Sequence, residues 1–282
     1  MSKDIRAVCV IGWPVKHSRS PLIHNFWIGQ RAIDGEYRRE EVSAEEFPDF
    51  VKELSARGYA GANVTIPHKE IAMTLSKPDD RAEAVGAANT LWFEGDTLRS
   101  TNTDVEGFLA NLDQMAPGWD RGLETAIVLG AGGAARAIVF GLLSRGVKTV
   151  RVVNRTVARA EALRERFGKQ VKPTTWDEVG GLLAGAGLLV NTTPLGMDGK
   201  PALNLRLEDL PKSAVVADIV YAPLVTPLLR EARDLGLRHA DGLGMLLHQA
   251  VRGFSLWFGV TPEVTPELRA MVEADLTRPK PE

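Results

Sequence analysis

The sequence predicts an α/β protein with two domains. The chain has 282 residues, which is long for one domain. A glycine-rich turn at 130–133 lies between an apolar, strand-like run and a helical pattern. From about Gly122 to Gly242, short Val-rich segments alternate with helix-like segments, which is typical of a parallel sheet covered by helices.

The first half alternates in the same way, which favours a second α/β unit with a mostly parallel sheet. We expect, in order, a strand at 6–11, a helix from Ser20-Pro21 to Ile33, a helix at 47–54 opened by a Ser43–Glu46 capping box and stopped by Gly58, a strand at 59–66, a hairpin of 89–93 and 97–101, and a helix opened by a Thr103–Glu106 capping box. Helices are also expected at 246–258 and after Pro266, with a frayed tail at 278–282.

The glycine-rich turn has the pattern of a nucleotide site. Gly130 permits a tight turn, Gly132 lets the backbone approach a pyrophosphate, and Ala135 allows close packing of the helix. The free N–H groups at such a helix start attract anions. We therefore expect a Rossmann-like dinucleotide-binding domain at 107–245, and a second domain made of 1–106 and 246–282.

The end of the next strand, at 149–153, indicates which dinucleotide is bound. An Asp or Glu there is typical of NAD, but this chain has Asn154, Arg155 and Thr156. Because a guanidinium attracts a 2′-phosphate, we expect NADP, with Arg159, one helical turn past Arg155, as a second cation. The alternative is that both arginines are solvated surface charges.

Composition excludes several classes of protein. The 34 basic and 36 acidic residues give a net charge of −2 without long single-sign blocks, so neither a nucleic acid nor a membrane is an expected partner. The single cysteine, Cys9, lies in an apolar run and is expected to be a buried thiol. The polar start, Met1 to Arg6, predicts neither a signal peptide nor a spanning helix, so we expect a cytoplasmic protein.

Three polar clusters in the first half are candidates for substrate contacts. Ser18 and Ser20 precede a helix and can both face an anion, although Ser20 can equally be the cap of that helix. Alternation in the 59–66 strand places Asn63 and Thr65 on one face, with Lys69 just beyond Pro67. The third cluster is formed by 89–90 and 101–104. Taken singly, Lys69 reads as a surface lysine and Asp104 as a carboxylate that favours a helix dipole.

The order and spacing of these motifs resemble those of shikimate dehydrogenases. The matching segments cover nearly the whole chain: Gly12-Trp13-Pro14 through Ser18-Arg19-Ser20-Pro21, Asn63-Val64-Thr65-Ile66-Pro67-His68-Lys69, Asn102-Thr103-Asp104, Gly130-Ala131-Gly132-Gly133-Ala134, Asn154-Arg155-Thr156, Asn191 to Met197, Asp218 to Pro223, and Asp241-Gly242 through Gln249. One position varies within the family, because His68 stands where other members often have Phe or Tyr.

The resemblance implies reversible, NADP-dependent interconversion of shikimate and 3-dehydroshikimate in the aromatic amino-acid pathway. It also implies an active site in the cleft between the two domains, and no metal. Lys69 and Asp104 are the implied catalytic pair, with Lys69 as the group that transfers the proton. The other implied roles are substrate carboxylate binding by Ser18, Ser20 and Tyr221, ring hydroxyl binding by Asn63, Thr65, Asn89 and Gln249, cofactor binding by Gly130, Ala131, Gly132, Gly133, Ala134, Asn154, Arg155, Thr156 and Arg159, and a position near the nicotinamide for Gly242.

Other functions stay open at this point. The nearest is a related enzyme that accepts quinate or uses NAD; Arg155 argues against NAD but says little about quinate. A non-catalytic NADP sensor is a different class, and it would be expected to lack Lys69 or Asp104. A structural interaction module gives the ordered polar motifs no purpose. The sequence leaves a monomer and a homodimer equally open.

Overall fold

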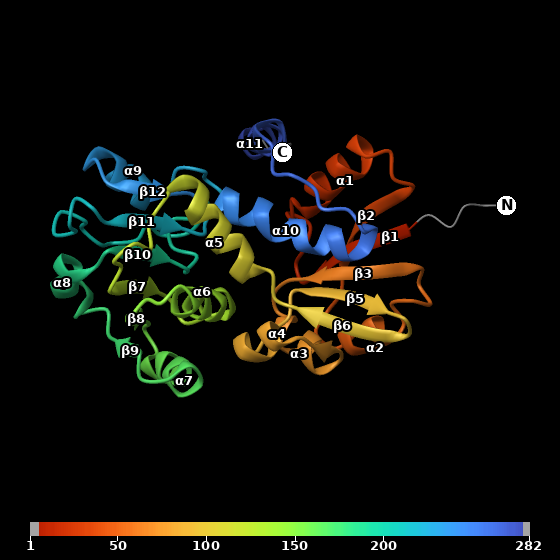
Figure 1. Ribbon diagram of the computed structural model, residues 1–282, viewed down its shortest axis with the longest axis horizontal. Coiled ribbons are helices and arrows are strands. Elements are labelled where there is room, and N and C mark those ends of the chain that lie inside the picture. Colours follow the sequence, from red (N-terminus) through yellow and green to blue (C-terminus); the bar gives the residue numbers. More distant parts are fainter. Residues whose placement is uncertain (1–5, 279–282) are drawn as a thin grey trace. The chain divides into compact units, whose positions relative to one another are not determined.

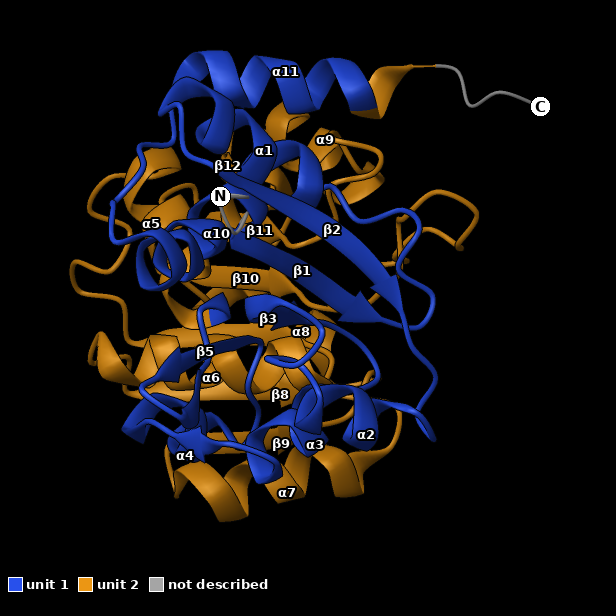
Figure 2. Cartoon of the chain, turned by 90° about the vertical axis from the view of Figure 1, so that its right-hand side faces the viewer, with its two compact units in different colours: residues 1–104, 246–275 blue, residues 105–245, 276–282 orange. Residues whose placement is uncertain are grey.

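A computed structural model of the chain describes residues 6–278. The described chain forms two compact units (Figure 2). Unit 1 contains the residues up to Asp104 together with Leu246–Asp275, and unit 2 contains Val105–Met245 and the C-terminal end from Leu276. The N-terminal residues 1–5 and most of the expected frayed tail, 279–282, lie outside the described residues. No helix among the described residues is long and apolar enough to cross a membrane.

Unit 1 is built on a six-stranded sheet (Figure 1). Its strands are β1 (Arg6–Gly12), β2 (Gly35–Glu41), β3 (Tyr59–Val64), β4 (Lys77–Pro78), β5 (Thr90–Glu94) and β6 (Thr97–Thr101), in the order β2-β1-β3-β5-β6-β4. The expected hairpin is confirmed as the antiparallel pair β5 and β6. The expectation of a mostly parallel sheet is confirmed for this unit, because β1 pairs in parallel with β2 and β3, and β4 pairs in parallel with β6. Only β5 runs antiparallel to its neighbours, β3 and β6.

Strand β2 is absent from the sequence-based prediction. Its sequence, GEYRREE, carries charges throughout and has one buried residue, Tyr37. The strand lies at the edge of the sheet and pairs only with β1, in parallel. Charged side chains are common on edge strands because they discourage further pairing. The strand was not predicted because its sequence lacks the alternation of apolar residues that marks a half-buried strand.

Helices cover both faces of the unit 1 sheet (Figures 1 and 2). They are α1 (Ser20–Gln30), α2 (Phe47–Lys52), α3 (Lys69–Thr74), α4 (Asp80–Val85), the last three turns of α10 (Gly242–Phe258) and α11 (Pro266–Thr277). The Ser43–Glu46 capping box is confirmed by reciprocal hydrogen bonds of 3.3 Å. Two helices end earlier than expected, α1 at Gln30 and α2 at Lys52, while α10 begins four residues earlier, at Gly242.

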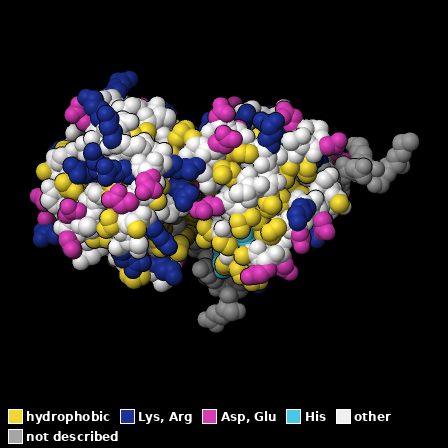
Figure 3. Space-filling model, turned by 90° about the horizontal axis from the view of Figure 1, so that it is seen from below, with side chains coloured by type: hydrophobic (Ala, Val, Ile, Leu, Met, Phe, Trp, Pro, Cys, Tyr) yellow, Lys and Arg dark blue, Asp and Glu magenta, His cyan; other side chains and the backbone are white. Residues whose placement is uncertain are grey.

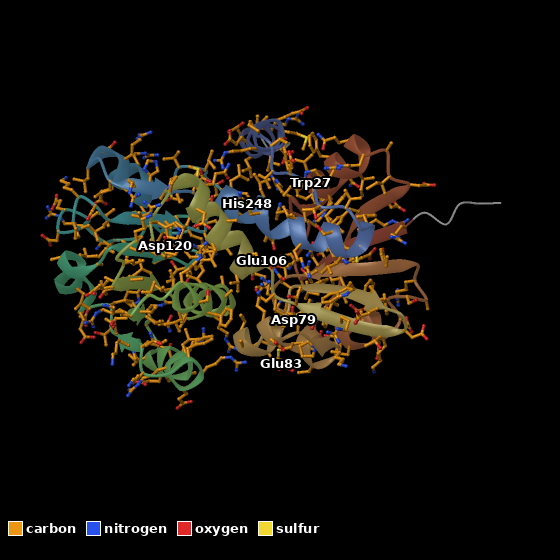
Figure 4. All side chains as sticks on the ribbon, viewed as in Figure 1. Trp27, Asp79, Glu83, Glu106, Asp120 and His248 are labelled. Carbon is orange, nitrogen blue, oxygen red and sulfur yellow. The ribbon has the colours of Figure 1, made fainter. Side chains whose placement is uncertain are left out.

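The two faces of this sheet have different cores. On the face of α2 and α3, an apolar cluster joins Cys9, Ile11, Ala62, Phe47 and Leu54. The expected burial of the Cys9 thiol is confirmed. The face of α1 and α10 is aromatic: Trp27 of α1, labelled in Figure 4, and Phe254 of α10 meet edge to face at 5.4 Å.

Unit 2 has the predicted Rossmann-like sheet. Its strands are β7 (Thr125–Leu129), β8 (Thr149–Val153), β9 (Val171–Thr174), β10 (Leu188–Asn191), β11 (Val215–Asp218) and β12 (Arg238–Ala240). They pair in parallel in the order β12-β11-β10-β7-β8-β9. Read within the unit, this is the 3-2-1-4-5-6 order of dinucleotide-binding folds, with the strand order reversing beside β7.

Alternation along β7 sends its side chains into two cores. Ala126 and Val128 pack with α5 (Asp104–Met115), α6 (Gly133–Ser144) and α7 (Val157–Phe167). Ile127 and Leu129 pack on the opposite face with α8 (Val179–Leu182), the short 3₁₀ helix at Leu183–Gly185, and α9 (Pro227–Asp234). This sandwiched sheet presents the β7–α6 turn at its carboxyl edge.

Candidate active site

Lys69 and Asp104 are joined directly. Lys69 is the first residue of α3, Asp104 is the first residue of α5, and Lys69 Nζ donates to Asp104 Oδ2 over 2.6 Å. Their side chains are 19% and 7% exposed. With these exposures Lys69 is not a free surface lysine, while Asp104 keeps the helix-start position at α5 that also favours a carboxylate.

Asn89 holds the other oxygen of the carboxylate. Its Nδ2 donates to Asp104 Oδ1 over 2.9 Å and to Gln249 Oε1 over 3.2 Å. Its Oδ1 accepts from the backbone N–H of Thr103 over 2.8 Å, and from the hydroxyls of Thr103 and Thr90. Asn89 therefore links β5, the start of α5 and α10, and it fixes the orientation of Asp104.

Asn63 makes three hydrogen bonds within the protein. It is the penultimate residue of β3, 6% exposed, and its Nδ2 donates to the Asn89 carbonyl and to Thr90 Oγ1 over 3.2 and 3.1 Å. Its Oδ1 accepts from the Tyr37 hydroxyl over 2.6 Å. Only one lone pair of Asn63 Oδ1 is left to meet a ligand.

Thr65 lies just beyond the observed strand, although the expected strand at 59–66 included it. The strand β3 ends at Val64, so Thr65 and Ile66 belong to a turn, and Ile66 is exposed rather than packed. The Thr65 backbone donates to the Ile11 carbonyl over 2.9 Å, and its methyl group lies against Gly12, where an added Cβ would approach it within 2.4 Å. Thr65 is partly exposed and its hydroxyl remains a candidate for ligand contact.

The Ser18–Ser20 segment is held from two sides. Arg39 of β2 donates from Nε and Nη2 to the Ser18 carbonyl over 3.1 and 2.8 Å. The Ser18 hydroxyl accepts from the Ser20 backbone N–H over 3.3 Å. Ser20 is the first residue of α1 and Arg19 is the N-cap residue, without a side-chain cap. The alternative that Ser20 is the cap of α1 is therefore wrong.

His68 supports the start of α3 from the core. Its ring is fully buried, stacks on Phe47 with centroids 4.3 Å apart, and places Nε2 2.8 Å from the Val42 carbonyl. Burial lowers the pKa of His68, which favours the neutral ring that this apolar site requires. A Phe ring at this position would keep the stacking and lose the bond to Val42.

The glycine turn in unit 2 leaves space beside a free helix start. Gly130 has φ +105°, and a Cβ there would lie 2.6 Å from the Thr192 hydroxyl, so glycine is required. Gly132 is the N-cap of α6 without a side-chain cap bond, and an added Cβ at Gly132 or Gly133 would meet nothing within 4 Å. The turn thus exposes uncapped N–H groups next to open space, which suits a pyrophosphate. Ala131 lies in the turn, Ala134 is the second residue of α6, and Ala135 is buried.

The segment after β8 carries the two arginines. Asn154 Nδ2 donates to the Thr156 carbonyl over 2.8 Å, which closes a turn that exposes Arg155 and Thr156. Arg155 precedes α7, which begins at Val157, so the expectation that Arg159 lies one helical turn past Arg155 is wrong. Arg159 is exposed in the first turn of α7. Arg155 just before α7 and Arg159 in its first turn are therefore both exposed to solvent.

Tyr221 and Gly242 lie in unit 2, apart in sequence from the residues of the Lys69 cluster. Tyr221 follows β11 and is partly buried. Its segment is anchored by Asp218, which accepts from the Val220 backbone over 3.0 Å, Asn191 over 3.0 Å and Thr226 over 2.7 Å. A Cβ at Gly242 would lie 2.3 Å from the Ile219 carbonyl, so only glycine fits there.

Sequence patterns indicated no role for Tyr37, whose hydroxyl binds Asn63, and none of its own for Thr90, which also binds Asn63. Thr90 was visible next to Asn89, but Tyr37 lies in the charged strand that no hydrophobic pattern marked.

Among the described residues, no group of three or more His, Cys, Asp or Glu side chains is arranged to hold a metal ion. On the face shown in Figure 3, Lys and Arg side chains are interspersed with Asp and Glu.

Three family models match the chain. Residues 10–91 match the shikimate dehydrogenase substrate binding domain, residues 120–219 match shikimate / quinate 5-dehydrogenase, and residues 242–271 match the shikimate 5′-dehydrogenase C-terminal domain. The NADP(+) shikimate dehydrogenase of Rhodopseudomonas palustris strain HaA2 is 64% identical over 270 residues, which are 96% of each chain. The chain belongs to the shikimate dehydrogenase family.

Solved structures of this family agree with the fold. The shikimate 5-dehydrogenase of Thermus thermophilus, in complex with NADP(H) and shikimate, is 35% identical with a TM-score of 0.85, over 96% of this chain and 100% of that one. The quinate dehydrogenase of Corynebacterium glutamicum, in complex with NAD, is 29% identical with a TM-score of 0.88 over the same shares. The shikimate dehydrogenase fold predicted from the motifs is confirmed.

Proposed function

We propose that this protein is an NADP-dependent shikimate dehydrogenase that interconverts shikimate and 3-dehydroshikimate. The observation that carries the proposal is the Lys69–Asp104 pair, 2.6 Å apart and held by Asn89, in a chain 64% identical to an NADP(+) shikimate dehydrogenase. The reaction removes a hydride from carbon and a proton from its hydroxyl, so it needs a positioned base. A non-catalytic NADP sensor would not need this pair.

The domain roles follow from where each group lies. We assign substrate binding to 1–106 with 246–282, and NADP binding to 107–245. Ser18 and Ser20 would bind the substrate carboxylate, with Tyr221 contributing. Thr65 and Gln249 would bind ring hydroxyls. Asn89 would do so by exchanging its 3.2 Å bond to Gln249 for one to substrate, while Asn63 has only an acceptor to offer.

Lys69 moves the proton in this mechanism. In the oxidative direction its neutral amine takes the hydroxyl proton of shikimate, and in the reverse direction its ammonium returns a proton to the carbonyl oxygen. Asp104 accepts from Lys69 Nζ and so directs the amine, and Asn89 holds the remaining carboxylate oxygen.

NADP fits the residues of unit 2. The uncapped start of α6 and the open space at Gly132 and Gly133 suit its pyrophosphate, and the exposed Arg155 and Arg159 suit its 2′-phosphate, with Asn154 and Thr156 shaping the turn. When bound, the nicotinamide supplies the hydride acceptor. Gly242 would keep the backbone beside it free of a side chain.

A two-by-two assay tests the function. Purified protein is incubated with shikimate or quinate and with NADP⁺ or NAD⁺, and reduced nicotinamide is followed by absorbance. We expect shikimate with NADP⁺ to be the fastest combination. If neither acid is oxidised with either cofactor, the dehydrogenase proposal fails. Faster oxidation of quinate with NAD⁺ would favour the activity named for the Corynebacterium glutamicum relative.

The state of Cys9 bears on the compartment in which the enzyme works. The buried, unpaired thiol of Cys9 suits a reducing compartment, so we propose that the enzyme works in the cytoplasm. A monomer and a homodimer are both compatible with the proposal. Size-exclusion chromatography with light scattering separates them.

A further inference from the structure

We infer that Tyr37 is a positioning residue for the reaction, because its hydroxyl closes a buried hydrogen-bond relay that ends at the Asp104 carboxylate. The relay runs Tyr37, Asn63, Thr90, Asn89, Asp104, and the Lys69 ammonium binds the far oxygen of Asp104. The inference rests on the proposed function and adds to it a residue on the charged edge strand β2.

The direction of every bond is set from the Asp104 end. An ionised carboxylate only accepts, so Asn89 must turn its Nδ2 toward Asp104. The Thr103 backbone N–H only donates, so it requires the Asn89 Oδ1 on the other side, over 2.8 Å. Asn89 is therefore held in one amide orientation by two independent partners.

That orientation passes along the relay. Thr90 has one hydroxyl proton and donates it to Asn89 Oδ1 over 3.1 Å, so its lone pair accepts from Asn63 Nδ2 over 3.1 Å. The second Nδ2 proton of Asn63 goes to the Asn89 carbonyl, which can only accept. Asn63 Oδ1 must then face Tyr37, and the Tyr37 hydroxyl must donate.

Tyr37 is built to be a permanent donor. Its side chain is 3% exposed, and its ring stacks on His24 with centroids 4.2 Å apart and planes 2° from parallel. The Asn25 side chain binds both backbone groups of Tyr37, accepting from the N–H over 2.9 Å and donating to the carbonyl over 3.0 Å. Burial raises the pKa of Tyr37 well above its ordinary value, so the phenol keeps its proton.

Removing the Tyr37 hydroxyl by substitution leaves Asn63 Oδ1, the acceptor at this end of the relay, without its donor. Asn63 Oδ1 would be buried without its donor, and an amide in that state relieves the loss by shifting or flipping. A flip of Asn63 removes the donor to Thr90 and weakens the Thr90 bond to Asn89 Oδ1, which is one of the three bonds that this oxygen accepts. Asn89 then keeps its orientation but is held less tightly against Asp104. Small displacements of a catalytic group are costly because proton transfer depends on geometry.

The central experiment compares Tyr37→Phe with Tyr59→Phe. Both tyrosines are buried in unit 1, at 3% and 6% exposure, and both hydroxyls bind a side-chain oxygen, but Tyr59 bonds Glu40, outside the relay. We expect Tyr37→Phe to lower kcat for shikimate oxidation roughly tenfold, from the loss of one buried hydrogen bond. Tyr59→Phe should keep wild-type kcat. Equal kcat for the two variants, at matched melting temperatures, overturns the inference.

Thr90 supplies a second variant within the relay. Thr90→Val keeps the shape and breaks both relay bonds, whereas Thr90→Ser keeps the hydroxyl. We expect Thr90→Val to lower kcat roughly tenfold with KM within about twofold, and Thr90→Ser to restore most of it. Because the bonds are in series, Tyr37→Phe with Thr90→Val should cost much less than the product of the two single losses. Multiplicative losses, or no rescue by serine, contradict a relay.

A measurement without turnover separates this inference from the proposed function. Hydrogen exchange of the Asn89 side-chain amide is followed by NMR, after assignment by substitution. We expect exchange roughly tenfold faster in Tyr37→Phe than in wild type or Tyr59→Phe. Wild-type protein that is inactive on shikimate refutes the proposed function, and the exchange rates still decide the relay. Unchanged exchange in Tyr37→Phe refutes the relay even if the enzyme is active.

Discussion

Lys69 Nζ lies 2.6 Å from Asp104 Oδ2, across 35 residues of sequence. The two residues start different helices, α3 and α5, so their meeting depends on how the sheet of unit 1 arranges those helix starts. The carboxylate of Asp104 makes its bonds to residues distant in sequence, Lys69 and Asn89. Its backbone N–H has a local partner instead, Asn102 Oδ1, over 3.1 Å. The pair is the centre of the proposed chemistry.

Removing Lys69 should abolish most of the turnover while leaving substrate binding nearly intact. We expect Lys69→Ala to lower kcat by about two to four orders of magnitude, the range for a positioned acid or base. Adding Asp104→Ala should cost far less than the two separate losses multiplied, because the residues act as a unit. Steady-state kinetics and melting curves measure both effects. The exposed Lys52–Asp49 ion pair is the matched control, and near wild-type kcat in Lys69→Ala refutes the mechanism.

Arg155 should determine the choice of cofactor. Arg155→Ala removes an exposed guanidinium from the turn after β8, and the lost phosphate contact should cost about 1.5–3 kcal/mol, or roughly tenfold to a hundredfold in NADP⁺ affinity. NAD⁺ affinity should change little, because NAD⁺ lacks the 2′-phosphate. Titration of each cofactor by calorimetry gives both values. Arg164→Ala, on α7 and paired with Glu161, is the control, and equal weakening of NAD⁺ and NADP⁺ contradicts the 2′-phosphate assignment.

Ser18→Ala and Ser20→Ala should differ in their effect on the free energy of unfolding but not in their effect on KM for shikimate. Both alanine variants should raise KM for shikimate with little change in kcat, since a remote carboxylate contact exists in ground and transition states. Ser18→Ala should also lower the free energy of unfolding by about 0.5–1.5 kcal/mol, because Ser18 accepts from the Ser20 N–H. Ser20→Ala removes no helix cap.

A true helix cap provides the control for the serine variants. Asp79, labelled in Figure 4, accepts from the Ala82 N–H over 2.8 Å at the start of α4. Asp79→Ala should destabilise by about 1 kcal/mol and leave KM for shikimate unchanged. Unchanged KM in both serine variants would remove them from the carboxylate site.

His24 should make the protein sensitive to acid. Burial lowers the pKa of His24 to about 3, against 6.5 in the unfolded chain, with Asn63 opposing the shift. The unfolded state then binds the extra proton below pH 6.5, so stability present above that pH is lost as pH falls toward 3. The slope from this group is about 1.4 kcal/mol per pH unit. Urea unfolding at several pH values should show a flatter dependence in His24→Phe, and no flattening in the control His17→Phe, at an exposed site.

Local patterns predicted most of the fold. The Gly130–Gly133 turn, the Val-rich strands of unit 2 and the 90–101 hairpin each depend on neighbours in sequence, through turn geometry and the alternation of side chains. The same holds for the Ser43–Glu46 capping box, whose two bonds span three residues. The motif series also identified the family, because the order of its residues is a property of the chain alone.

Edges and ends were decided by packing instead. The strand β2 was invisible because an edge strand needs few apolar residues. The strand β3 stops at Val64 because the chain turns next, where the Thr65 carbonyl accepts from the His68 N–H over 3.0 Å. The sequence predicted a mostly parallel sheet and the hairpin of β5 and β6, but not which strands would be neighbours: the pairing of the 59–64 strand with β1 on one side and β5 on the other was decided by sheet assembly. No periodicity in the sequence indicates which strands will be neighbours in a sheet.

The residue types of the site were determined by the sequence, and their partners by the tertiary structure. Lys69, Asp104 and Asn89 were selected as members of motifs, without knowledge of which atoms would bond. Hydrogen bonds between side chains 15 to 160 residues apart became definite only when the sheet and α10 brought Asn89, Asp104 and Gln249 together. Tyr37 joined them because the parallel pairing of β2 with β1 set its register, a long-range constraint that no local pattern encodes.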